Sequence, residues 1–131
     1  MEQGYIYVAN NIYPSLIAIS EEEQAKGLMF EPFPPPIMSF IYAEPRINRF
    51  WMKNTPSPLD IVFCCNGEII QICKGEPYST STIGGAHSDL VIEFPFGTVL
   101  NHDIKLGHKV GIVEPREHEL KRIIARAAGI L

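Results

Sequence analysis

The chain has 131 residues, of which 46% are hydrophobic and 20% are charged, a composition typical of a single folded domain with a buried core. Its formal net charge of −4 argues against a protein that binds nucleic acid, because phosphate backbones are bound by basic surfaces. No apolar run reaches the length of about 18 residues that a membrane span requires, and the N-terminus lacks the basic and apolar parts of a signal peptide. We therefore expect a cytoplasmic protein that does not enter the membrane.

The N-terminal part of the chain predicts two short strands followed by a short helix. Residues 5–8 and 16–19 have strand composition, with a turn between them. Ser20 and Glu23 then fit a capping box, and Gly27 is suited to end the helix after about two turns. Such a short helix is marginal by itself, which leads us to expect that it packs on a sheet through three apolar residues, Ala25, Leu28 and Met29.

Proline residues divide the next part of the chain. Residues 31–36 form a stiff loop that can be neither a helix nor a central strand. Two strand-like segments follow, residues 38–42 and 48–54, and residues 54–58 then predict a constrained turn.

The Asn66-Gly67 pair is the strongest short signal for a β-hairpin, here between strands at residues 59–65 and 68–74. A two-residue turn at this pair places Cys65 opposite Glu68. Since side chains alternate along a strand, the hairpin then predicts one core face, formed by Ile61, Phe63, Cys65, Ile70 and Ile72.

The three cysteines, Cys64, Cys65 and Cys73, form neither an even disulfide framework nor the paired spacing of zinc ligands. In the predicted hairpin, Cys64 and Cys73 share the face opposite to the core but lie about 13 Å apart along the strands, too far for a disulfide. We interpret all three as small apolar residues on strands, with a reactive thiol as the alternative.

The C-terminal third predicts a loop at residues 76–88, a strand at 90–94, a short helix within 97–104 and a last strand at 109–114. Residues 1–115 therefore predict a single β-rich domain. Residues 116–131 predict an amphipathic helix that packs on this domain or on a partner, which leaves open a homo-oligomer formed through that helix.

Several sequence blocks accumulate along the chain: Gly27-Leu-Met29, Phe50-Trp-Met-Lys-Asn-Thr55, Pro58-Leu-Asp60, Val91-Ile-Glu-Phe94, Gly97 and Ile104-Lys-Leu-Gly107. In this order they resemble the domain of unknown function 192 family, from about residue 16 to residue 113. The resemblance implies a compact, mainly β fold, a sandwich or barrel with one or two short helices. It implies no function, because the family is uncharacterised, although many members look exported. This chain departs from the family pattern at Ser57, usually an apolar position, and at His108, usually an acidic one.

Four residues are the candidates for binding a ligand: Trp51, Lys53, Asn54 and Asp60. On a strand, Trp51 and Lys53 point to the same side, where a cation and a ring could hold an anionic or flat ligand. In the alternative interpretation Lys53 lies along Trp51 and pairs with Asp60 across the turn, which makes the residues structural. Asn54 and Asp60 could also bind backbone N–H groups of that turn. We further expect Trp51 and Phe63 to be core residues.

The remaining polar residues match no known catalytic or metal-binding pattern. The histidines, His87, His102, His108 and His118, lack ligand spacing, and residues 79–88 lack the lysine of a phosphate-binding loop. We therefore predict no metal and no cofactor. The sequence favours a non-catalytic domain that binds a small ligand or a protein. The alternative is a small enzyme in which Lys53, Asp60 and a histidine meet in one pocket.

Overall fold

The computed structural model describes residues 1–114 and residue 129. The elements of the described part are β1 (Glu2–Val8), β2 (Asn11–Ala18), α1 (Glu21–Lys26), β3 (Met38–Phe50), β4 (Leu59–Cys65), β5 (Glu68–Gly75), β6 (Ile83–Pro95), α2 (Thr98–Asn101) and β7 (Val110–Val113). The prediction of a mainly β fold with short helices is confirmed. The helix predicted for residues 116–131, and any oligomer formed through it, falls outside the described residues apart from Gly129.

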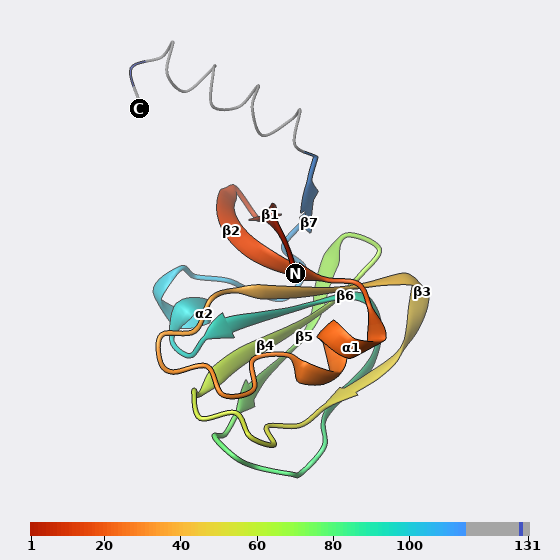
Figure 1. Ribbon diagram of the computed structural model, residues 1–131. Coiled ribbons are helices and arrows are strands. Elements are labelled where there is room, and N and C mark those ends of the chain that lie inside the picture. The colour runs from red at the N-terminus through yellow and green to blue at the C-terminus, as the bar shows by residue number, and fades with distance from the viewer. Residues whose placement is uncertain (115–128, 130–131) are drawn as a thin grey trace.

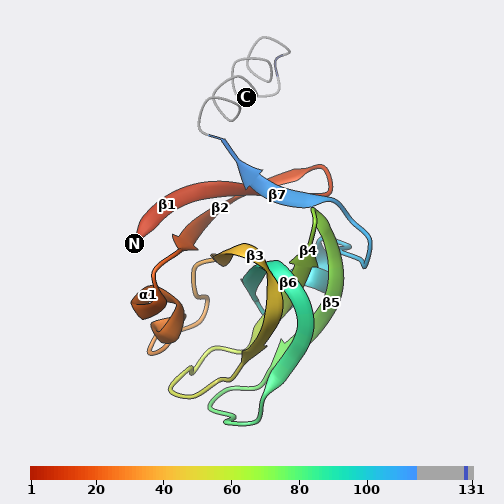
Figure 2. The ribbon, with the colours of Figure 1, turned by 90° about the vertical axis from the view of Figure 1, so that its right-hand side faces the viewer.

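The strands form one seven-stranded sheet in the order β5-β4-β6-β3-β2-β1-β7. The sheet curves so that β1, β2 and β7 lie across from β3 to β6 (Figures 1 and 2), but it does not close into a barrel. An isolated bridge between Glu68 and Lys109, together with backbone hydrogen bonds from Ile69 to His108 and from Val110 to Gly67, joins the two edge regions. Neighbouring strands are antiparallel except β2 and β3, which are parallel, and α1 lies in the connection between them. No helix of the described residues is long and apolar enough to cross a membrane.

Two hydrophobic clusters lie on opposite faces of the central strands β4 and β6. The first cluster contains Ile6, Val8, Tyr13, Val62, Cys64, Ile69, Leu90, Ile92, Phe94, Ile104 and Val110. The second cluster contains Ala18, Leu28, Met38, Phe40, Met52, Leu59, Ile61, Phe63 and Val91. Since side chains alternate along a strand, β4 and β6 each contribute to both clusters, which explains their nearly continuous apolar sequences.

The hairpin at Asn66-Gly67 is confirmed, and Cys65 pairs with Glu68 as predicted. A bulge between Phe63 and Cys64 then changes the register, so that Phe63 pairs with Gln71 instead of Ile70. Ile70 is therefore exposed, and Ile72 packs against the first cluster whereas Ile61 and Phe63 belong to the second, so the predicted core face is wrong at both Ile70 and Ile72. Nothing in the turn sequence distinguishes the bulged hairpin from the regular one.

The bulge also changes the interpretation of the cysteines. Cys64 belongs to the first cluster, whereas Cys73 packs against the second, so the prediction that they share a face is wrong. The three cysteines lie on or at the end of strands, as predicted. Burial raises the pKa of the Cys64 thiol to about 12, and burial also raises the pKa of Cys73, which disfavours a reactive thiolate at either residue.

Two strands are longer than predicted. Residues 38–42 and part of 48–54 join into the single strand β3, which ends before Trp51. Residues 83–88, predicted as loop, begin β6. A Cβ on Gly84 would lie 2.2 Å from Cζ of Phe63, so the glycine is needed for the close approach of a ring and not for a loop.

Candidate functional site

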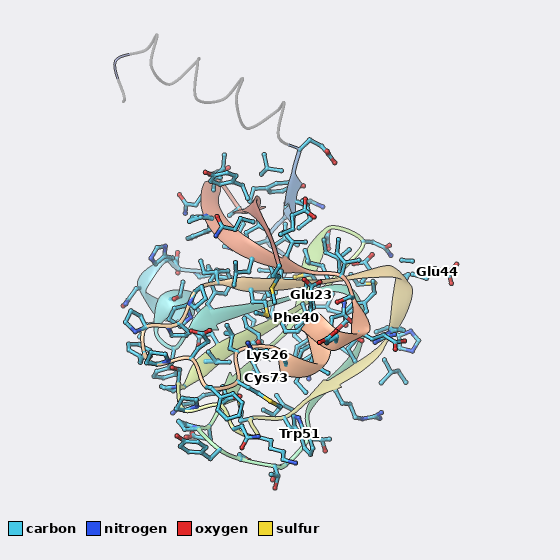
Figure 3. The ribbon with its side chains drawn as sticks, viewed as in Figure 1. Glu23, Lys26, Phe40, Glu44, Trp51 and Cys73 are labelled. Carbon is cyan, nitrogen blue, oxygen red and sulfur yellow. The ribbon has the colours of Figure 1, made fainter. Side chains whose placement is uncertain are left out.

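A cleft of about 490 Å³ opens between α1, β3 and residues 51–55, above the second cluster. A volume of this size suits a small organic ligand. Its aromatic lining residues are Phe40, Tyr42, Phe50 and Trp51, and its charged ones are Glu21, Lys26, Arg46, Arg49 and Glu93. Figure 3 shows Lys26 at the end of α1, Phe40 close to it, and Trp51 toward the end of the molecule away from β1. A second cleft of similar volume lies along β1 and β2, and none of its described lining residues is acidic or basic.

The helix α1 forms one wall of the cleft and is fixed by its polar side chains. The predicted capping box is confirmed, since Ser20 and Glu23 exchange side chain to backbone hydrogen bonds. Gln24 Nε2 donates to the carbonyl of Ala18 at 3.1 Å and to that of Ile41 at 3.0 Å, which ties the helix to both β2 and β3. Leu28 packs into the second cluster as predicted.

Ala25 was also expected to pack on the sheet, but it is exposed and lines the cleft. No residue of α1 itself is buried. The wall is therefore held by the capping box, the amide of Gln24 and the residues after the helix, and its cleft side is not filled by apolar packing.

Glu93 lies in the floor of the cleft. It is opposite Ile61 in the β4–β6 ladder, so its side chain faces the second cluster, and it is only 4% exposed. A Cβ built on Gly27 would lie 3.8 Å from its Oε1 atom. Within the described part of the chain no hydrogen bond or ion pair involves its carboxyl group, yet no fully buried side-chain oxygen lacks a partner. The carboxyl oxygens must therefore reach the cleft.

Burial raises the pKa of Glu93 to about 8. At neutral pH the carboxyl group is therefore mostly protonated, and a protonated carboxyl can both donate and accept a hydrogen bond. Burial also raises the pKa of the neighbouring Tyr42, while Arg46 acts in the opposite direction. Glu93 and Tyr42 are therefore both mainly neutral at pH 7, and each can donate and accept a hydrogen bond.

Arg46 is a cation held in place at the cleft. Its Nε donates to Oδ1 of Asn48 at 2.9 Å, and its Cζ lies 4.3 Å from the centre of the Tyr42 ring. Asn48 is buried, and its Nδ2 donates to the hydroxyl oxygen of Ser88 at 2.8 Å and to the carbonyl oxygen of Ser88 at 2.9 Å. The amide thus fixes the guanidinium group, and the ring supports it from one side.

The predicted site residues are only partly brought together. Trp51 lines the cleft but is 48% exposed, so the expectation that it is a core residue is wrong, whereas Phe63 is fully buried as expected. Lys53 Nζ lies 5.3 Å from the centre of the Trp51 ring, but both residues follow the end of β3 and do not lie on the predicted strand. Asn54 has a φ of 55°, and its carbonyl accepts from the N–H of Phe30. Neither Lys53 nor Asn54 lines the cleft.

Asp60 lies on the other face of the sheet, opposite Phe94, and it is 6% exposed. Its Oδ2 accepts from the backbone N–H groups of Gly97 at 3.1 Å and Val99 at 2.9 Å, at the start of α2. None of the ion pairs among the described residues joins it to Lys53, so the predicted pair is not formed. The prediction that Asp60 binds backbone N–H groups was right in kind but wrong about which segment it binds.

The histidines of the described residues do not join Lys53 and Asp60 in one pocket. His102 Nδ1 lies 2.9 Å from the hydroxyl oxygen of Tyr13, and His87 pairs with Ile47 in the sheet. His118 lies outside the described part of the chain. No group of three or more His, Cys, Asp or Glu among the described residues could hold a metal ion.

The two departures from the family pattern each have a local explanation. Ser57 is fully buried, and its hydroxyl donates to the carbonyl of Glu31 at 2.7 Å, so the polar group is satisfied where an apolar residue is usual. His108 Nδ1 accepts from the N–H of Lys105 at 3.0 Å, the acceptor role that an acidic side chain would also fill. Neither residue lines the cleft.

Glu93 and Arg46 were not among the predicted site residues. The signal for Glu93 was present, because it is the one acid in the apolar run Val91–Phe94, and a charged residue inside a buried strand requires an explanation. Arg46 carried no such signal, because its position depends on a break in the β3–β6 ladder between Ile41 and Arg46.

Comparison with known proteins identifies the family but not an activity. A crystal structure of a protein of unknown function from Novosphingobium aromaticivorans is 30% identical, with a TM-score of 0.78 over 83% of this chain and 84% of that chain. A crystal structure of a candidate transcription regulator from Sinorhizobium meliloti is 25% identical, with a TM-score of 0.78 over 85% and 94%. No curated protein matches the chain. The pattern of the family described as an uncharacterised ACR matches residues 11–112, and the chain therefore belongs to the domain of unknown function 192 family.

Proposed function

We propose that this chain is a non-catalytic domain that binds a small ligand in the cleft between α1 and β3. The observation that supports this proposal is Glu93, a buried carboxyl group that reaches the cleft and has no partner in the described part of the chain. Since its oxygens reach the cleft, a molecule bound there can form the hydrogen bonds that no described residue supplies to this carboxyl group. Perturbed titratable groups in clefts are typical of functional sites.

The sequence blocks that carry the family resemblance support the same location. Gly27 and the two residues after it, Trp51 with Phe50 and Thr55, and Glu93 come from three separate blocks, and all of them line this cleft. The blocks are far apart in the sequence, and only the fold brings them to one place. A cleft of this size fits a small molecule better than a protein surface, which would need a larger and flatter area.

Catalysis is less well supported than binding. Among the described residues, the lining of the cleft includes no histidine, serine or cysteine that could act as a nucleophile. Asp60, a member of the predicted enzyme site, is occupied by the N–H groups that begin α2. The net charge of −4 also argues against direct binding to DNA, so we do not extend a transcriptional role to this chain.

A fragment screen followed by protein NMR would test the proposal. We expect small fragments to shift the backbone amide signals of Gly27, Trp51 and Glu93 together, and Glu93→Gln to change the affinities. Glu44→Gln is the matched control, because Glu44 is an exposed acid that does not line the cleft. A screen in which all hits shift amides elsewhere, or in which both variants behave as the wild type, would overturn the proposal.

The cytoplasmic location expected from the N-terminal residues, and a homo-oligomer formed through residues 116–131, are further parts of the proposal. Cell fractionation and light scattering would check them, respectively. Recovery of the chain from an exported fraction would contradict the first, and a monomeric mass at all concentrations would contradict the second.

A further inference from the structure

Resting on the proposed function, we infer that the ligand of the cleft is a small aromatic carboxylate, bound with its anionic group between the carboxyl of Glu93 and the cations at the rim. Three features of the cleft point to this class of ligand: the balance of charges at its rim, the hydrogen-bonding character of its floor and the aromatic rings on its walls.

The charged side chains at the rim favour an anion. Lys26, Arg46 and Arg49 are exposed cations that line the cleft, and Glu21 is the exposed acid that lines it with them. Arg46 is held in position by Asn48 and by the Tyr42 ring, so little side-chain entropy is lost when an anion binds to it. Guanidinium groups match the geometry of carboxylates better than ammonium groups do.

The floor of the cleft offers a donor to the same anion. Glu93 has no hydrogen-bonding partner among the described residues, and burial favours its neutral form. A neutral carboxyl group can donate its proton in a hydrogen bond to a carboxylate oxygen, and this type of bond is stronger than one between neutral groups. A cationic ligand would instead have to ionise Glu93 and approach three cations at the rim.

The aromatic lining supplies the apolar part of the site. Trp51 is half exposed and lines the cleft. Phe50 and Tyr42, both on β3, line it as well. Exposed large rings are unfavourable in water, and stacking on a flat ligand would cover them. The ring of Trp51 also contacts Lys53, which adds a positive charge near the mouth of the cleft.

The pH dependence follows from the groups that face Glu93. From α1 these are Glu21 and Lys26, from β3 they are Tyr42, Arg46 and Arg49, and the described cleft lining contains no histidine. Arginine keeps its charge at all accessible pH values, and the pKa of Tyr42 is raised, so neither changes below pH 9. Deprotonation of Glu93 is therefore the change expected to weaken the binding of an anion between pH 7 and pH 9.

Three probes of nearly equal shape separate the charge classes: benzoate, benzamide and benzamidine, which are anionic, neutral and cationic. Titrations of each into the full chain at pH 6.5, followed by amide NMR, should give shifts at Gly27, Trp51 and Glu93 with benzoate bound tightest. Arg46→Gln should weaken benzoate about tenfold, as expected for one charge-assisted hydrogen bond. Lys105→Gln, which removes an exposed cation outside the cleft, is the control and should leave the affinity unchanged.

A second set of titrations tests Glu93 directly. At pH 9 benzoate should bind the wild type about tenfold more weakly than at pH 6.5, because most of the neutral carboxyl is lost. Glu93→Gln keeps a donor that does not titrate, so its benzoate affinity should be the same at both pH values. A folded Glu93→Gln protein that still shows the tenfold loss would contradict the role of this carboxyl.

The outcomes separate this inference from the proposed function. Benzamidine or benzamide binding in the cleft more tightly than benzoate would overturn the inference and leave a ligand-binding cleft. The absence of shifts with all three probes would overturn the inference as well, and the fragment screen then decides whether the cleft binds any small molecule. Benzoate bound only at amides outside the cleft would also contradict the inference.

Discussion

Asp60 and Glu93 are two carboxyl groups on neighbouring strands that are buried to nearly the same extent but differ in their hydrogen-bond partners. Asp60 is 6% exposed and Glu93 is 4% exposed, and β4 and β6 place them on opposite faces of the sheet. Asp60 accepts two backbone hydrogen bonds at the start of α2. Glu93 faces the second cluster and the cleft, where no described residue bonds to its carboxyl group, and burial raises its pKa to about 8.

Burial alone does not identify a functional acid. Asp60 was a candidate because it lies beside a stiff turn, yet its hydrogen bonds show a structural role. Glu93 was not a candidate, yet it is the one that remains without a partner among the described residues. The hydrogen-bond partner, and not the depth, distinguishes the two groups.

Asp60 and Glu93 both lie on strands of one well-packed sheet, and substitution of Phe63 tests this packing. Phe63 is fully buried in the second cluster below the cleft, so Phe63→Ala should lower the free energy of unfolding by about 4 kcal/mol through the cavity it leaves. Trp51→Ala should cost less than about 1 kcal/mol, since Trp51 is half exposed at the rim. Urea unfolding measures both, and equal losses would contradict the placement of the two rings.

The next largest effect is the pH dependence of the free energy of unfolding, which we expect from Glu93. The pKa of Glu93 is raised in the folded state, so between pH 4.5 and about 8 the folded protein binds more protons than the unfolded chain. Stability should therefore fall as pH rises through this range, by on the order of 3 kcal/mol between pH 5 and pH 8. Glu93→Gln should remove this fall.

Urea unfolding at pH 5, 6.5 and 8 measures this difference, with Glu44→Gln as the exposed control that keeps the wild-type slope. If Glu93→Gln showed the same fall as the wild type, another group would be responsible and the contrast with Asp60 would be lost.

Asp60→Ala tests the structural side of the comparison. The substitution leaves the N–H groups of Gly97 and Val99 without an acceptor, so it should cost about 2 kcal/mol in the free energy of unfolding. Asp60→Asn keeps one acceptor oxygen and should cost less. Chemical shifts of these two amides would report the change directly, and unchanged shifts would show that Asp60 does not hold α2.

The smallest expected effect is the coupling between Lys53 and Asp60. A double-mutant cycle of Lys53→Met and Asp60→Asn should give an interaction free energy near zero, within about 0.3 kcal/mol, because each residue has other partners. A coupling near 1 kcal/mol, measured by denaturant unfolding, would instead support the ion pair across the turn and contradict the role assigned to Asp60.

The sequence by itself determined the features that depend on neighbouring residues. The capping box at Ser20, the helix end at Gly27 and the hairpin at Asn66-Gly67 were predicted correctly, because each motif satisfies its own backbone groups within a few residues. The mainly β fold followed from the many short apolar runs between turn residues, together with the family resemblance.

The tertiary structure decided the features that depend on distant residues. Residues 83–88 look like a loop until the Phe63 ring is placed against Gly84, 21 positions away in the chain. Asp60 receives its hydrogen bonds from residues 37 and 39 positions away. The sequence marks Glu93 as an acid within an apolar run, but only the fold brings α1, β3 and the 51–55 segment around it. The desolvation that raises its pKa comes from groups brought together in this way.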